Sequence, residues 1–115
     1  MIIVVVVQAG SWELVAMDHQ LFAYGTLLSA SVQRAVIGRA VSGEPAELAG
    51  FRKSTLQDGD EVFPNLVPEP GETVCGHVFE VTDAELSRVD RYEGDLYARH
   101  RVTLKDGREV WVYYS

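Results

Sequence analysis

Residues 83–102, DAELSRVDRYEGDLYARHRV, contain the clearest helix signal in the chain. Leu86, Val89 and Glu93 fall at positions i, i+3 and i+7, a spacing that puts all three on one face of a helix. The first two are apolar and suit a face that packs on a core, whereas the third is a carboxylate. The stretch therefore poses a functional question, because an acid stands where the apolar face of the helix ends.

The residues around this stretch define where the helix begins and ends. Thr82 and Glu85 match a capping box, in which the two residues satisfy each other's backbone N–H groups. Gly94 stands at the stop position directly after Glu93. The sequence therefore predicts a helix that starts at Thr82 and ends at Glu93.

Strands are predicted on both sides of this helix. Residues 73–81, TVCGHVFEV, alternate between two faces, and residues 96–104 and 109–114 read as further strands. Asp106-Gly107 between the last two is a strong hairpin signal. The helix is thus expected to pack on a sheet that continues to the end of the sequence.

The N-terminal half predicts a second helix and a loop. Residues 20–25 read as a short strand, and residues 29–39 have helical spacing with Ser29 or Ser31 as the cap. Residues 46–56 predict a strand, whereas residues 58–72, with Pro64, Pro68 and Pro70, predict a loop-rich segment. Together these elements predict an α+β domain around a mixed, mostly antiparallel and strongly curved sheet. A small β-barrel with short helices is the expected form of this sheet.

Composition limits the classes of protein and partner. The 115 residues suit a single domain, 1–115, with one core. A net charge of -7, with no basic cluster beyond ARHR at residues 98–101, argues against nucleic acid as a partner. Cys75 is the only cysteine, so no internal disulfide can form and a cytoplasmic location is expected.

The N-terminal residues need a separate interpretation. The apolar run in MIIVVVVQAGSWELVAM, residues 1–17, is too short to span a bilayer and lacks the basic flank of a signal peptide, so no membrane association is expected. A buried strand is the favoured interpretation. Met17 opens what looks like a second start, so our hypothesis is that residues 1–16 form an N-terminal extension without a chemical role.

Glu93 is the candidate catalytic residue. A carboxylate in the last turn of a helix meets the negative end of the helix dipole, and an inward position removes it from water; both effects raise its pKa. Such an acid can accept and return a proton near neutral pH. The alternative is that Glu93 reaches past the core and pairs with Arg99 or Arg101. For the neighbouring Asp90, a solvated or arginine-paired acid is the favoured interpretation.

A candidate binding loop lies far from Glu93 in the sequence. YGTL, residues 24–27, falls where a strand gives way to a helix, and Gly25 lets the backbone bend. Exposed N–H groups just before a helix can hold an anion such as a carboxylate. The alternative is an ordinary turn, since many strand–glycine–helix junctions have this sequence pattern.

Taken together, these stretches resemble the gamma-glutamylcyclotransferase-like family. The resemblance runs from about His19 to the C-terminus, and it rests on FAYGTLL at 22–28, FPNLVPEPGETVCGHVFEV at 63–81 and the Asp-x-x-Glu-Gly-x-x-Tyr-x-Arg run at 90–99. It implies a small mixed barrel, substrate binding by Tyr24, Gly25, Thr26 and Leu27, and Glu93 as the general acid/base. Tyr97, which follows Glu93 closely, is expected to line the same pocket.

The chemistry implied by the resemblance needs few groups. The α-amine of a γ-glutamyl amide attacks its own γ-carbonyl, which gives 5-oxoproline and releases an amine. Because the attack is intramolecular, no serine or cysteine nucleophile is required, and one carboxyl group can carry the proton. Neither a metal nor a cofactor is expected. The γ-glutamyl donor and the oligomeric state remain open.

The remaining polar residues and the alternative functions have weaker support in the sequence. Cys75 and His77 lie about 7 Å apart along a strand, too far for a ready catalytic dyad. His19, His77 and His100 lack metal-ligand spacing. The alternative function is a binding module that holds a γ-glutamyl or other carboxylate metabolite without turnover. A nucleic-acid-binding barrel is a third hypothesis, and the negative charge counts against it.

Overall fold

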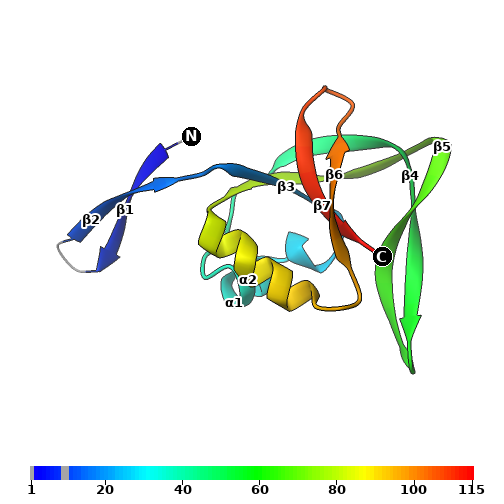
Figure 1. Ribbon diagram of the computed structural model, residues 1–115, viewed down its shortest axis with the longest axis horizontal. Coiled ribbons are helices and arrows are strands. Elements are labelled where there is room, and N and C mark those ends of the chain that lie inside the picture. Colours follow the sequence, from blue (N-terminus) through cyan, green and yellow to red (C-terminus); the bar gives the residue numbers. More distant parts are fainter. Residues whose placement is uncertain (1, 9–10) are drawn as a thin grey trace.

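A curled five-stranded sheet with two short helices forms the body of the protein (Figure 1). The computed structural model describes residues 2–8 and 11–115, with side chains from residue 17 onward. The strand order in the sheet is β4-β5-β3-β7-β6. The elements are β3 (His19–Ala23), η1 (Thr26–Leu28), α1 (Ala30–Val36), β4 (Glu44–Asp58), β5 (Glu61–Val81), α2 (Asp83–Glu93), β6 (Ala98–Thr103) and β7 (Glu109–Tyr114).

The pairing of the strands is mostly antiparallel, with one parallel contact. β3 is antiparallel to β5 and parallel to β7, where Leu21 pairs with Trp111. The hairpin between β6 and β7 is antiparallel, as Asp106-Gly107 predicted. The predicted α+β class with a mixed, curved sheet is therefore confirmed, and the curl of the sheet makes a half-barrel.

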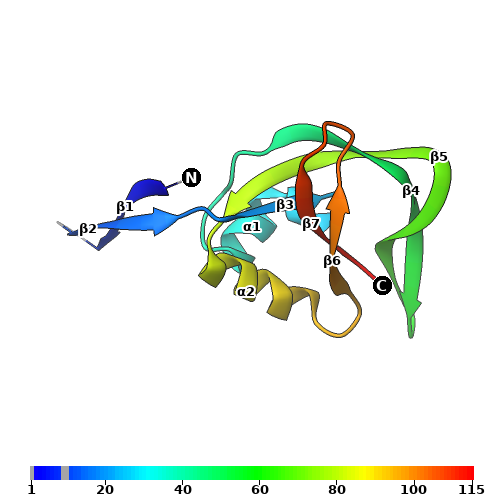
Figure 2. The ribbon, with the colours of Figure 1, turned by 45° about the horizontal axis from the view of Figure 1, so that its top comes forward.

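Each face of the sheet carries a group of buried apolar residues, since successive side chains of a strand point to opposite faces. α1 and α2 lie on the same side of the sheet and cover one face (Figure 2), where Leu21 and Phe79 pack against Leu86 and Val89 of α2. The curl of the sheet encloses the other face, where Phe22 and further apolar residues pack together. This second group comprises Phe22, Leu48, Leu66, Val74, Val78, Leu104, Val110 and Val112.

The two ends of α2 lie where the capping box and Gly94 predicted them. The Thr82 hydroxyl accepts a hydrogen bond from the Glu85 N–H at 3.1 Å, and a Glu85 carboxylate oxygen accepts one from the Thr82 N–H at 3.0 Å. Gly94 follows the last turn with φ +61°, a conformation that residues with a Cβ rarely adopt. The capping box and the glycine stop are both confirmed.

The first helix differs from its prediction in detail. It covers residues 30–36, shorter than the predicted 29–39, and the 3₁₀ turn η1 precedes it. Ser29 occupies the N-cap position, but its hydroxyl bonds to the hydroxyl of Ser31 at 3.0 Å and caps no backbone N–H. The predicted side-chain cap is therefore wrong, because a nearby hydroxyl competes for the same group.

The predicted loop-rich segment at 58–72 is wrong. After a turn at Gly59–Asp60, β5 runs without interruption from Glu61 to Val81. Within the described chain, β3 pairs only with residues 77–81 of β5, so the preceding part of β5 has β4 as its sole sheet neighbour. Prolines are tolerated on such an edge, because their missing N–H would face away from the partner strand.

β4 and β5 bend where their pairing shifts. Ala49 pairs with Thr73, whereas Phe51 pairs with Pro68, so residues 69–72 of β5 lie opposite Gly50. Beyond this shift the two strands leave the sheet as an arm, which we define as residues 51–68 (Figure 1). The arm projects past the C-terminal end of β7.

The N-terminal residues form a separate two-stranded sheet. β1 (Ile2–Gln8) pairs antiparallel with β2 (Ser11–Ala16), and neither strand pairs with the five-stranded sheet. The strand predicted for the apolar run is confirmed, whereas β2 was not predicted. Whether the side chains of this run are buried lies outside the described residues, and the hypothesis of an N-terminal extension stays a prediction.

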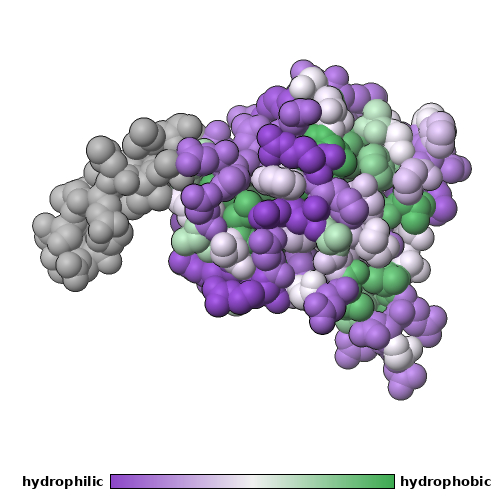
Figure 3. Space-filling model, in the orientation of Figure 1, coloured by the Kyte–Doolittle hydropathy of each residue, from purple (hydrophilic) through white to green (hydrophobic). Residues whose placement is uncertain are grey.

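The helices are short, and much of the surface visible in Figure 3 is polar. Across the part of the chain that the structure describes, no helix is long and apolar enough to cross a membrane. α2 has 11 residues, whereas a membrane span needs about 20. The face shown in Figure 3 is mostly hydrophilic, with small hydrophobic areas between the polar side chains.

Candidate active site

A cavity of about 230 Å³ opens between the loop after β3, the arm and the C-terminal end of α2. All residues that the sequence assigned to a site line this cavity, although they come from two distant parts of the chain. They are Tyr24, Gly25, Thr26, Leu27, Glu93 and Tyr97. The fold thus brings the candidate acid and the candidate binding loop to opposite walls of one cavity.

The position of Glu93 follows from the packing of α2. Leu86 and Val89, on the same helix face, are 3% and 0% exposed, which directs that face inward. Glu93 lies one turn further on, at the edge of the core, where it is half-buried and lines the cavity. Burial raises the pKa of Glu93 to about 7, because a low-dielectric environment disfavours the charged carboxylate.

The arginines near Glu93 have other partners. Arg99 forms an ion pair with Asp90 at 3.2 Å and stacks on the ring of Trp111, 4.4 Å from its centroid. Arg101 also lies over this ring, with its guanidinium carbon 4.9 Å from the centroid. Within residues 17–115, no ion pair involves Glu93, so the alternative in which it pairs with Arg99 or Arg101 is not observed. The arginine-paired interpretation of Asp90 is confirmed.

The loop opposite Glu93 presents backbone N–H groups. In η1 the first intrahelical hydrogen bond is donated by the Leu28 N–H to the Gly25 carbonyl at 3.0 Å. The N–H groups of Thr26 and Leu27 precede this bond, and the first N–H groups of a helix have no intrahelical acceptor. Both residues line the cavity, and N–H groups without an intrahelical acceptor are the kind of donor that binds an anionic group.

Gln33 holds this loop from behind. Its side-chain amide is 4% exposed and donates to the Leu27 carbonyl at 2.8 Å, while its amide oxygen accepts from the Val41 N–H at 3.0 Å. A buried amide with both ends bonded is a rigid support. Sequence reasoning missed Gln33, because a glutamine inside a helix gives no signal of what it contacts.

Four tyrosine hydroxyls connect the walls of the cavity to one another. They join Tyr24 to the Tyr113 carbonyl (2.6 Å), Tyr92 to the Thr26 hydroxyl (3.0 Å), Tyr97 to the Pro64 carbonyl (2.6 Å) and Tyr113 to the Asp90 carboxylate (2.5 Å). Burial raises the pKa of Tyr24, Tyr97 and Tyr113, so all three hydroxyls remain protonated at neutral pH.

The cavity is therefore equipped for proton transfer in an aromatic environment. Its one carboxyl group has a pKa near neutral pH, and its other polar groups are hydroxyls and backbone amides. Cys75 is exposed and lies outside this cavity. Among the described residues, no three His, Cys, Asp or Glu side chains gather closely enough to hold a metal ion.

Comparison with known proteins agrees with this arrangement. Residues 21–115, which contain the whole cavity lining, match the family described as gamma-glutamyl cyclotransferase, AIG2-like. The chain belongs to this family. The resemblance that the sequence motifs indicated is thereby confirmed.

Two plant proteins show the extent of the similarity to known sequences. The chain is 32% identical over 85 residues to AIG2-like protein D of Arabidopsis thaliana, covering 73% of this chain and 55% of that protein. It is 33% identical over 83 residues to Protein AIG2 C of the same plant, covering 71% and 49%. The chain thus spans about half the length of these relatives.

Solved structures support the fold. The solution structure of an Arabidopsis thaliana protein is similar with a TM-score of 0.70 and 30% identity, over 84% of this chain and 61% of that one. A structure named gamma-glutamyl cyclotransferase has a TM-score of 0.65 over 84% of this chain and 65% of that one. Because its identity is 19%, this second similarity concerns the fold alone.

Several residues of the cavity were missed by sequence reasoning. Phe63 and Pro64 fall in the segment predicted as a loop, so nothing placed them opposite Glu93. Tyr113 falls in the strand predicted at 109–114, where sheet packing is the expected role; it packs in the core and also lines the cavity. Tyr92 had one available signal, because it directly precedes Glu93 at the end of the helix.

Proposed function

We propose that this protein cyclises a γ-glutamyl amide or amine to 5-oxoproline and releases the amine or amino acid. The observation that carries the proposal is the half-buried Glu93, with a pKa of about 7, in a cavity that also contains residues 24–27. A general acid/base works best when its pKa lies near the operating pH. Membership of the gamma-glutamyl cyclotransferase, AIG2-like family supports the same reaction.

In the proposed binding step, the α-carboxylate of the γ-glutamyl group accepts hydrogen bonds from the N–H groups of Thr26 and Leu27. Tyr24 and Tyr97 enclose the glutamyl chain from both sides. This places the α-ammonium and the γ-carbonyl in the space next to Glu93. Holding both reacting groups of one molecule in this way replaces a slow bimolecular encounter by an oriented ring closure.

In the proposed chemical step, the Glu93 carboxylate takes a proton from the α-ammonium. The free amine attacks the γ-carbonyl carbon, and the new C–N bond closes a five-membered ring. Backbone N–H groups of the loop at 24–27 stabilise the oxyanion that develops. Glu93 then gives its proton to the leaving nitrogen, and the original amide C–N bond breaks. The ring nitrogen gives up its second proton to Glu93, which passes it to the released amine, so 5-oxoproline and an ammonium ion result. The step requires neither a protein nucleophile nor an added cofactor.

The direct test is a screen for 5-oxoproline release by the purified chain. Suitable donors are glutathione, γ-glutamyl amino acids, γ-glutamyl amines and γ-glutamyl-capped antibiotics, and we expect turnover of at least one class. Calorimetry on the same compounds measures binding independently. Tight binding without turnover for every donor would contradict the proposal and favour a binding module for carboxylate metabolites.

The environment of the reaction is part of the proposal. Cys75 is free and exposed, and exposed thiols persist in reducing compartments. We therefore propose a cytoplasmic location with small γ-glutamyl molecules as the partners. Fractionation of cells that produce the protein tests this directly, and recovery of the chain outside the cytoplasm would contradict it.

A further inference from the structure

A buried amide connects the arm to the end of β7. Asn65 is 4% exposed, and both ends of its side-chain amide bond to Ser115, which is 50 residues away in the sequence. The Ser115 N–H donates to Asn65 Oδ1 at 3.0 Å, and Asn65 Nδ2 donates to the Ser115 hydroxyl at 2.7 Å. A buried polar side chain with its donor and acceptor both satisfied is a specific contact.

This contact lies at the end of β7, on the side where the arm is its neighbour. The registered backbone pairing of β3 with β7 is at Leu21–Trp111, and further along Tyr24 reaches β7 through its hydroxyl, which bonds to the Tyr113 carbonyl. At Ser115, directly after β7, the partner is Asn65 of the arm. Pro64 has no N–H, so the backbone of the arm cannot supply a regular ladder at this point. The Asn65 amide supplies one donor and one acceptor in its place.

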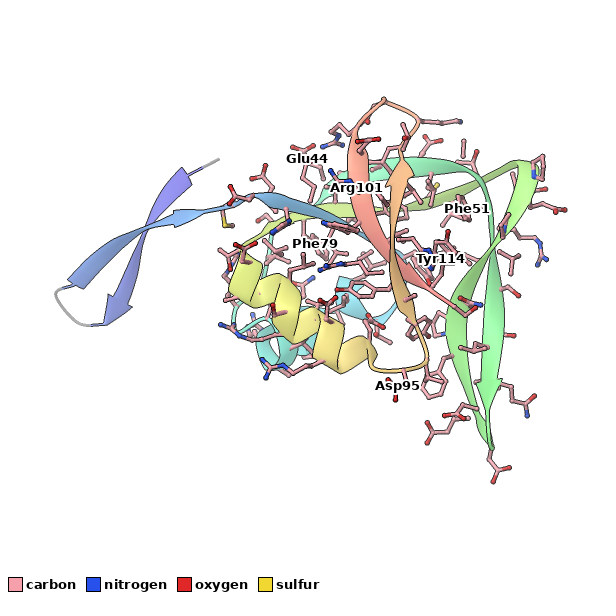
Figure 4. All side chains as sticks on the ribbon, viewed as in Figure 1. Glu44, Phe51, Phe79, Asp95, Arg101 and Tyr114 are labelled. Atoms are coloured by element: carbon pink, nitrogen blue, oxygen red, sulfur yellow. The ribbon has the colours of Figure 1, made fainter. Side chains whose placement is uncertain are left out.

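Aromatic packing follows the same seam between the arm and β7. Phe51, at the base of the arm, meets Tyr114 edge-on, with ring centroids 5.5 Å apart. Figure 4 shows these two labelled side chains between β4 and the end of β7. Tyr114 also stacks on His100 of β6 at 3.7 Å. The base of the arm is therefore held by apolar contact, whereas Asn65 holds it further out.

The residue next to Asn65 belongs to the cavity wall. The Pro64 carbonyl accepts the hydrogen bond of the Tyr97 hydroxyl at 2.6 Å. The Pro64 ring also lies beside the binding loop, 3.5 Å from where a Cβ on Gly25 would stand. Phe63 and Pro64 both line the cavity. Any movement of the arm at residue 65 is thus transmitted to Tyr97 and to the loop at Gly25.

We propose that Asn65 is a positioning residue that closes the half-barrel on Ser115 and so holds Pro64 as a fixed wall of the cavity. Asn65 itself does not line the cavity; it acts through Pro64, Gly25 and Tyr97. The catalytic consequence rests on the proposed function, whereas the closure of the sheet is a property of the free protein. Without the contact, the arm keeps the packing of Leu66 and the hydrogen bond from Tyr97 to Pro64, but it loses its polar link to Ser115, so Pro64 is held less firmly at its distance from the loop at 24–27.

Three variants separate this role from a general loss of stability. Asn65→Ala removes both hydrogen bonds, and Ser115→Ala is a milder change that removes only the hydroxyl. Lys105→Met is the control, because it breaks another contact between distant elements, Lys105 to Glu47 at 3.2 Å, that involves no lining residue of the cavity. All three are compared at equal occupancy of the folded state, measured by urea denaturation.

The first readout is amide hydrogen exchange in the ligand-free protein. We expect Asn65→Ala to speed exchange of the β4-paired amides at 61–68 by about ten-fold relative to the rest of the sheet, since local opening becomes easier. Ser115→Ala should have a smaller effect in the same segment, and Lys105→Met none. Unchanged protection at 61–68 in Asn65→Ala would overturn the inference, whatever the enzymatic result.

The second readout is the kinetics with a donor found active in the screen. We expect Asn65→Ala to raise KM by about ten-fold with a smaller change in kcat, because the wall is misplaced while Glu93 keeps its environment. Equal KM values for Asn65→Ala and Lys105→Met would overturn the positioning role. If the wild type turns over no donor, the proposed function fails, and hydrogen exchange alone still decides whether Asn65 closes the sheet.

Discussion

The two ends of α2 each carry a glutamate, and the two side chains behave in opposite ways. Glu85, in the first turn, receives hydrogen bonds from the Arg39 guanidinium at 2.7 and 3.0 Å and from the Thr82 N–H. Glu93, in the last turn, faces the cavity and has no ion-pair partner within residues 17–115. Burial raises the pKa of Glu93 to about 7. At Glu85 burial acts in the same direction, but Arg39 and Thr82 outweigh it and lower the pKa.

The contrast shows that burial alone does not decide whether an acid is structural or reactive. At the first turn, donors and a positive charge stabilise the carboxylate, so Glu85 stays charged and holds α2 to the segment after α1. At the last turn no such partner stabilises the charge, so Glu93 is ready to exchange a proton near neutral pH. The predictions below test this difference from its largest expected effect to its smallest.

Replacing Glu93 by glutamine is expected to have the largest effect. The amide keeps the shape of the side chain but cannot carry a proton, so turnover of an active donor should fall by at least about 10²–10⁴-fold. Donor affinity should survive, because the N–H groups at 26 and 27 are unchanged. The measurement is 5-oxoproline release by wild type and variant, with affinity measured by calorimetry. Equal rates for the two proteins would exclude Glu93 as the general acid/base.

Removing the cation at the other end of α2 should affect stability instead. Arg39→Met leaves the Glu85 carboxylate with the Thr82 N–H but without its ion pair, which should lower the free energy of unfolding by about 1–3 kcal/mol. The pKa of Glu85 should rise, because the stabilising charge is gone. Urea denaturation measures the first effect, and kcat of the folded variant should match the wild type. A large loss of kcat would show that the two ends of the helix are coupled.

The two glutamates should also give stability opposite dependences on pH. The pKa of Glu93 is about 7 in the folded state against an ordinary value of 4.5, so the folded state binds the proton more tightly. Its stabilising contribution is complete below pH 4.5 and is lost as the pH rises towards 7. Because the carboxyl group keeps some access to solvent, we expect a change of up to about 2 kcal/mol.

The measurement is the free energy of unfolding of wild type and Glu93→Gln from well below pH 4.5 to above pH 7. The wild type should lose stability relative to the variant as the pH rises. Glu85 has a lowered pKa, so its contribution is present above its ordinary value of 4.5 and is lost as the pH falls through its folded pKa. The comparison of wild type with Glu85→Gln should therefore have the opposite slope. A common slope for both pairs would contradict the contrast between the two ends.

The smallest effect is expected at the helix cap. Thr82→Ala removes the hydroxyl that accepts from the Glu85 N–H, which should cost about 1 kcal/mol of stability. Ser29→Ala is the matched control, because Ser29 stands at an N-cap without capping a backbone N–H. Denaturation of both variants should show a loss for Thr82→Ala alone. Similar losses at the two positions would mean that the capping bond contributes little.

The sequence by itself determined the features that depend on neighbouring residues. The spacing of Leu86, Val89 and Glu93 directed the acid to the inner face, because helical geometry relates residues three and four positions apart. Thr82 and Gly94 marked the helix ends, since capping bonds and backbone freedom act within one turn. The last strands and their hairpin followed from alternation and from Asp-Gly, and the motif resemblance selected six of the residues that line the cavity.

Only the tertiary structure decided the features that depend on distant partners. Pro64 and its neighbours look like strand breakers locally, yet they form a strand because the edge of β5 facing away from β4 is free there. From the sequence, Arg99 could pair with either Glu93 or Asp90. In the structure Arg99 packs on Trp111 and forms its ion pair with Asp90. Likewise, nothing near Asn65 in the sequence indicates Ser115. Such contacts are chosen by the folded geometry, because residues far apart in the chain compete for each partner and only one arrangement satisfies them together.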